Sequence, residues 1–135
     1  MSQPSFLAAS LYVAFGGGFG AWLRFLVGRG WAAALGPVRA GAFPYGTLTV
    51  NVVGSLAMGL LAGWLARHGS HGEGTRLLLA VGVLGGFTTF SSFSLDVVTL
   101  VERGQAGAAV FYAGLSVLAG VGGLFLGLLA MRSVS

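Results

Sequence analysis

A chain of 135 residues is short enough to form one domain, and 56% of its residues are hydrophobic while only 7% are charged. Soluble domains carry roughly 25% charged residues, so this composition excludes a soluble protein and predicts an integral membrane protein. The absence of cysteine excludes disulfides and thiolate metal sites, and the net charge of +4 comes from arginines too scattered for a nucleic-acid footprint.

Four apolar spans follow one another, and each is long enough for a helix that crosses about 30 Å of hydrocarbon. We predict an all-α single transmembrane domain over residues 1–135, with spans at about 6–28, 45–66, 75–100 and 106–131. The first span lacks the charged leader of a signal peptide, so we expect it to be retained. The short connection at 102–105 predicts that the third and fourth helices are antiparallel neighbours.

Glycine contributes 25 residues, and several glycines recur four apart within the spans. These pairs are Gly16/Gly20, Gly59/Gly63, Gly82/Gly86 and Gly123/Gly127. Small residues at this spacing let helix backbones approach closely in lipid, so the pattern predicts tight helix–helix packing.

Arginines are almost evenly divided between the two sides of the predicted membrane. One side carries Arg67, Arg76 and Arg132, and the other carries Arg29, Arg39 and Arg103, with Arg24 near the end of the first span. Orientation follows such charge bias in short loops. The balance therefore predicts that the chain inserts both ways and forms an antiparallel, dual-topology homodimer. A fixed topology set by other factors is the alternative.

The third span contains an unusual run at residues 85–94, Gly-Gly-Phe-Thr-Thr-Phe-Ser-Ser-Phe-Ser. Irregular backbone survives at membrane depth only where it is buried in protein or lines a cavity. Paired glycines permit such irregularity, and five hydroxyls can bond the freed backbone groups or face a solute. We therefore predict that the third helix is broken near its middle, at a permeation or ion-binding site.

Polar residues elsewhere in the spans are costly in lipid and tend to face the bundle interior. Thr47, Asn51 and Ser55 share one face of the second helix because they lie four residues apart. Asn51 has two interpretations, an interhelical hydrogen bond or an amide N–H directed into a pore. Tyr112 and Ser116 form a weaker polar row on the fourth helix.

Phe90 and Phe93 lie three apart on the third helix. They are either ordinary core residues or present positive ring edges to a small anion. Arg24 and Asp96 are the charges closest to lying within the spans. Arg24 can extend its guanidinium to the interface, and Asp96 either pairs with an arginine or lines a vestibule.

The chain resembles the CrcB/Fluc fluoride channels over essentially its whole length. The resemblance rests on three motifs, namely residues 85–94, 20–24 (Gly-Ala-Trp-Leu-Arg) and 46–54 (Gly-Thr-Leu-Thr-Val-Asn-Val-Val-Gly). It implies a dual-topology homodimer with two antiparallel pores. One departure is Gly120, where a further hydroxyl is common.

The same resemblance implies roles for individual residues. The pore would be lined by Thr47, Asn51, Phe90, Phe93, Tyr112 and Ser116. A structural sodium ion would be held by the backbone carbonyls of Gly85 and Thr88, and Arg24 would be structural or would attract anions. Asp96 has no assigned role beyond those given above.

The expected function is a passive fluoride channel that exports the ion through the inner or plasma membrane. No catalytic constellation is present, so an enzyme is not expected. A small dual-topology, proton-coupled exporter of organic cations is the main alternative, but the first span lacks the carboxylate that this mechanism needs. A non-transporting scaffold is a second alternative, and it leaves Asn51 and the hydroxyl run unexplained.

Overall fold

Long apolar helices make up most of the computed structural model, which describes residues 3–68 and 72–133. The segments long and apolar enough to cross a membrane are α1 (Phe6–Leu35), α3 (Tyr45–His68), residues Glu73–Glu102 and α7 (Ala106–Ser133). A short helix, α2 (Pro37–Ala42), lies between α1 and α3. The chain is therefore a multi-pass membrane protein, as its composition predicts.

The third of these segments is not one uniform helix. It consists of α4 (Glu73–Thr75), η2 (Arg76–Leu84), α5 (Gly85–Phe87) and α6 (Phe90–Glu102). Residues of η2 follow a wider π-helix, in which the Gly85 N–H donates to the Ala80 carbonyl five residues earlier. Sequence reasoning did not predict this π-helix.

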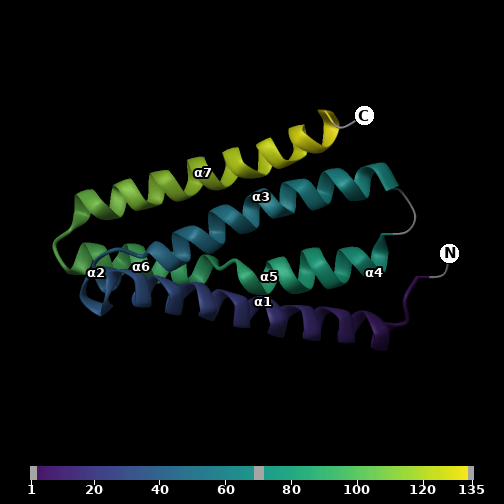
Figure 1. Cartoon of the computed structure of the whole chain (residues 1–135), viewed down its shortest axis with the longest axis horizontal. Coiled ribbons are helices and arrows are strands. Elements are labelled where there is room, and N and C mark those ends of the chain that lie inside the picture. Colours follow the sequence, from purple (N-terminus) through teal and green to yellow (C-terminus); the bar gives the residue numbers. More distant parts are fainter. Residues whose placement is uncertain (1–2, 69–71, 134–135) are drawn as a thin grey trace.

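The helices are arranged as two pairs (Figure 1). Helix α1 packs against η2 and α5, and α3 packs against α7. Within each pair the two helical segments run in the same direction, and the segments of one pair run opposite to those of the other. Both termini therefore lie at one end of the bundle, which an even number of crossings requires.

Glycines allow the helix backbones of each pair to approach closely. A β-carbon at Gly20 would overlap the Val83 carbonyl, and one at Gly59 would overlap the Leu124 carbonyl. Gly16, Gly82, Gly86 and Gly127 likewise leave no room for a β-carbon against a neighbouring backbone, Gly63 leaves none against the Met131 side chain, and Gly123 lies at ordinary contact distance. The predicted tight packing is confirmed.

The first helix is longer than expected. The connection predicted over residues 29–44 is instead largely helical, because α1 continues past Arg29 to Leu35 and α2 follows. Helix α1 ends at Gly36, whose φ of 78° suits glycine, and Pro37 then begins α2. The physical reason is that a charge ends an apolar span without ending a helix, and residues 31–35 are mostly good helix formers.

The turn between α6 and α7 is as tight as predicted. Gly104 adopts φ 74°, and the Gln105 N–H donates to the Leu100 carbonyl at 2.9 Å. This geometry returns the chain so that α7 packs antiparallel against α6. The turn thereby brings the polar row of α7 beside the residues that follow the hydroxyl run.

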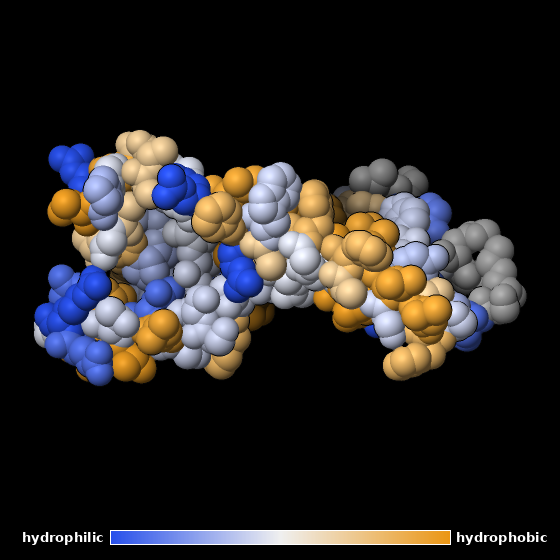
Figure 2. Space-filling model, turned by 90° about the horizontal axis from the view of Figure 1, so that it is seen from below, coloured by the Kyte–Doolittle hydropathy of each residue, from blue (hydrophilic) through white to orange (hydrophobic). Residues whose placement is uncertain are grey.

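The surface is divided into hydrophilic and apolar regions. Strongly hydrophilic residues gather at the end of the molecule that carries α2 and the α6–α7 turn (Figure 2). Large apolar side chains such as Phe15, Phe25, Leu118 and Val121 are exposed along the helices. Of the two histidines, His68 ends α3 and His71 lies outside the described residues.

Candidate functional site

Two extended residues, Thr88 and Thr89, separate α5 from α6 in the middle of the third segment. Their backbone angles are φ −81°, ψ 159° and φ −155°, ψ 121°. Each hydroxyl stabilises one side of the interruption. Thr88 Oγ1 donates to the Leu84 carbonyl at 2.9 Å, and Thr89 Oγ1 accepts from the Ser92 N–H at 3.2 Å as the N-cap of α6.

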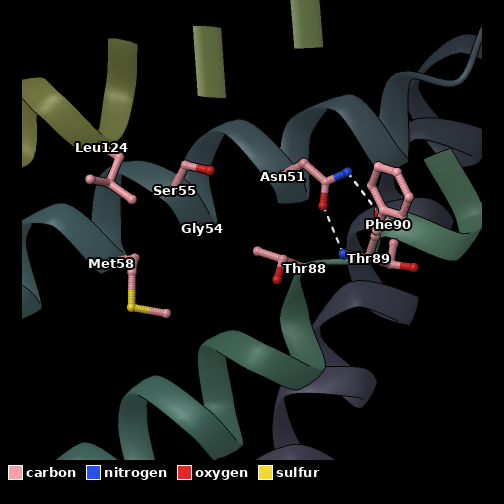
Figure 3. Close-up of a pocket in the computed structure, with 8 residues that line it drawn as sticks. All are labelled: Asn51, Gly54, Ser55, Met58, Thr88, Thr89, Phe90 and Leu124. Atoms are coloured by element: carbon pink, nitrogen blue, oxygen red, sulfur yellow. Dashed lines mark hydrogen bonds between the residues drawn. The ribbon is translucent and has the colours of Figure 1, made fainter. Parts of the chain in front are cut away.

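Asn51 on α3 bridges this interruption (Figure 3). Its Oδ1 accepts from the Thr89 N–H at 2.7 Å, and its Nδ2 donates to the Thr89 carbonyl at 3.0 Å. One amide side chain therefore bonds both backbone groups of Thr89, and it supplies the acceptor that the Thr89 N–H would otherwise find in a continuous helix. The structure shows the interhelical interaction of Asn51, and its contact with an anion stays a prediction.

The extended residues also release backbone carbonyls. In a continuous helix the Gly85 carbonyl would accept from the Thr89 N–H, which here donates to Asn51. The Thr88 carbonyl would accept from the Ser92 N–H, which here donates to the Thr89 hydroxyl. Both carbonyls predicted to hold sodium thus lose their usual helical donor.

A cavity of about 260 Å³ lies beside the interruption. Its lining combines the Asn51 amide and the two threonines with small and apolar groups (Figure 3). The lining residues are Asn51, Gly54, Ser55, Met58, Thr88, Thr89, Phe90 and Leu124. Of these, Ser55 was noted for its spacing and Gly54 as part of the 46–54 motif, both without a role, and neither Met58 nor Leu124 was singled out from the sequence.

The two phenylalanines differ in exposure. The Phe90 side chain is 78% exposed, whereas Phe93 is half-buried and packs against the cluster formed by Leu100, Ala109 and Tyr112. The rings of Phe90 and Phe93 have centroids 5.6 Å apart, and those of Phe93 and Tyr112 are 5.4 Å apart. The three rings thus form a continuous series from the surface into the core.

The polar row of α7 meets this series. Tyr112 is fully buried, and its hydroxyl donates to Asp96 Oδ2 at 3.1 Å. The Ser116 Oγ is also buried and lies near the Tyr112 hydroxyl. Within residues 3–68 and 72–133 it has no partner of hydrogen-bonding geometry.

A second cavity, of about 420 Å³, brings together the remaining predicted residues. Arg24, Thr47 and Asp96 line it, with Ser92 and Thr89. Asp96 therefore lines a vestibule-like space, one of the two roles left open from the sequence. Thr89 lines both cavities, and its partner Asn51 lines the first of them.

Comparison with known proteins identifies the family of this chain. Residues 11–128 match the family model described as CrcB-like protein, Camphor Resistance (CrcB). The chain belongs to the CrcB family. A relative from Novosphingobium aromaticivorans is 60% identical over 129 residues, covering 96% of this chain and all of that protein.

Two further relatives are also similar to the chain over most of its length. A protein from Rhodospirillum centenum is 55% identical, covering 91% of this chain and 94% of its own. A protein from Caulobacter vibrioides is 50% identical, and the match covers 92% of this chain and 95% of that protein. All three relatives are named fluoride-specific ion channel FluC. An ion channel is not an enzyme, in line with the absence of a catalytic motif from the sequence.

Proposed function

We propose that this chain is a passive fluoride-selective channel that exports fluoride from the cytoplasm through the inner or plasma membrane. The observation that supports it most is the Asn51–Thr89 bridge, whose residues line a polar cavity in an otherwise apolar set of helices. The identity of the ion is proposed from the relatives, which are named fluoride-specific ion channels. Fluoride would enter the cell as HF at acid pH, dissociate, and leave down its gradient.

Selectivity for fluoride over chloride would come from a small number of closely spaced hydrogen-bond donors and ring edges. An amide nitrogen carries two protons, and the bond to the Thr89 carbonyl uses one of them. The other proton can donate to a dehydrated fluoride. The edges of Phe90 and Phe93 add weak positive potential without a full charge. A larger chloride ion would gain less from donors and ring edges spaced for fluoride.

The remaining predicted residues line the approaches to this constriction. Arg24 and Thr47 line the 420 Å³ cavity, where a guanidinium attracts anions from solution. Tyr112 and the unpartnered Ser116 hydroxyl continue the polar row on α7. Arg24, Thr47 and Ser116 would give an anion successive donors, whereas the single hydroxyl proton of Tyr112 already bonds Asp96.

The working unit is an antiparallel homodimer with two pores. Phe90 is 78% exposed in a single chain, although its ring lies beside the proposed ion path. A second copy in the opposite orientation would cover this ring and the cavity that it lines. The even distribution of arginines supports insertion in both orientations.

A structural sodium ion fits the interruption. The Gly85 and Thr88 carbonyls have lost their usual helical donors, and unwound backbone carbonyls are suitable ligands for sodium. Two copies related by a twofold axis would supply four such oxygens. The ion would hold the two interruptions together at the centre of the dimer.

Flux measurements on purified protein in liposomes test the proposal. Loaded vesicles are diluted, and efflux of fluoride, efflux of chloride, and proton-coupled uptake of an organic cation are compared. Fast fluoride efflux with little chloride efflux is expected. Cation uptake driven by a proton gradient would support the exporter alternative, and no flux of any kind would support a scaffold.

A further inference from the structure

The polar row on α7 continues to a position without a side chain. Tyr112, Ser116 and Gly120 lie four residues apart and share one helix face. A β-carbon built at Gly120 would lie 3.5 Å from Ser55 Oγ, which is ordinary contact distance. The Ser55 hydroxyl of α3 therefore lies where the next side chain of the α7 row would begin.

Ser55 lacks the backbone hydrogen bond that several other hydroxyls in the bundle make. Thr49 Oγ1 donates to the Tyr45 carbonyl at 2.7 Å, and Ser94 Oγ donates to the Phe90 carbonyl at 2.9 Å. This backward bond is the usual arrangement for hydroxyls in helices. For Ser55 no such bond exists to any residue that the structure describes. Its oxygen instead lines the 260 Å³ cavity (Figure 3).

We propose that the Ser55 hydroxyl donates to fluoride in the pore, one turn along α3 from Asn51. It would supply from α3 the donor that Gly120 does not supply from α7. This inference rests on the proposed fluoride channel and adds a permeation residue to it. It also explains how the polar row continues past Ser116 although the chain has glycine at position 120.

Three variants test the inference in the liposome efflux assay. Ser55→Ala removes the hydroxyl, and we expect fluoride efflux to fall about tenfold because a hydrogen bond to an ion is lost. Ser55→Cys keeps a side chain of similar shape, but its thiol is a weak donor, so fluoride efflux should also fall. In Ser55→Ala with Gly120→Ser, a hydroxyl returns from α7, and efflux should recover to within about threefold of the wild type.

Ser10→Ala is the matched control, because the Ser10 hydroxyl is exposed on α1 and bonds the Phe6 carbonyl. It should conduct like the wild type. Gel filtration of each variant verifies assembly, and Ser55→Cys carries the test if Ser55→Ala fails to assemble. Wild-type efflux in both Ser55 variants would overturn the inference alone, as would failure of Gly120→Ser to restore it. Absence of fluoride efflux from the wild type would overturn the proposed channel and this inference together.

Discussion

Replacing Asn51 separates its two roles, the backbone bridge and the donor to an anion. Asn51→Ala removes both hydrogen bonds to Thr89, at 2.7 and 3.0 Å. Asn51→Asp keeps an acceptor for the Thr89 N–H but loses the donor to its carbonyl, and it adds a negative charge beside the proposed path. Both variants should destabilise the extended segment at Thr88 and Thr89. The aspartate should in addition repel fluoride.

The magnitudes distinguish the two effects. Hydrogen bonds between membrane helices contribute on average about 0.6 kcal/mol, so losing two costs roughly 1 kcal/mol of stability. Loss of a donor to an ion costs about 1.5–3 kcal/mol, or roughly tenfold or more in flux. A carboxylate about 5 Å from fluoride at an effective dielectric constant near 20 adds about 3 kcal/mol of repulsion, which is more than 100-fold.

We therefore expect Asn51→Ala to reduce fluoride efflux roughly tenfold and Asn51→Asp to abolish measurable efflux. Efflux is followed with a fluoride electrode, and thermal unfolding in detergent reports the small loss of stability in both variants. Wild-type efflux in Asn51→Asp would refute the role assigned to Asn51. Equal efflux in the two variants would show that the added charge does not face the ion.

Three further predictions test other parts of the structure. Phe90→Ile keeps similar bulk without a ring edge, so fluoride efflux should fall while the protein still assembles; unchanged efflux would contradict the ring-edge mechanism. Gly20→Ala should prevent stable folding because its β-carbon would overlap the Val83 carbonyl, whereas Gly18→Ala, with nothing within 4 Å, should unfold like the wild type. Replacing sodium by a bulky organic cation during purification should lower the melting temperature and the dimer fraction; identical melting curves would argue against the ion.

The periodic and compositional features of the fold were predictable from the sequence. Apolar length identifies the four spans, and glycines four apart identify where backbones touch, because both depend only on local spacing. The end of α1 was missed because the apolar span stops near Gly28 while helix-forming residues continue to Leu35. The π-helix of η2 was missed because its residues resemble those of any apolar helix.

The sequence predicted which residues form the candidate site better than it predicted which of them contact one another. Asn51 was singled out as a polar residue in a span, but its partner Thr89 lies 38 residues away and is chosen by tertiary packing. The bond from Tyr112 to Asp96 depends likewise on the turn that folds α7 onto α6. Spacing along one helix cannot show which residue of another helix it will meet.

The interruption in the third segment links assembly to conduction. Unpaired carbonyls cost several kcal/mol each in hydrocarbon, so the surface that carries Gly85 and Thr88 cannot face lipid. Phe90 on the same side is largely exposed in one chain. A second copy would cover this surface and complete the wall of the pore. A cation bound between the carbonyls of the two copies would also satisfy those groups. Variants that block dimer formation should therefore lose fluoride efflux completely, because no partly active single chain would remain in the membrane.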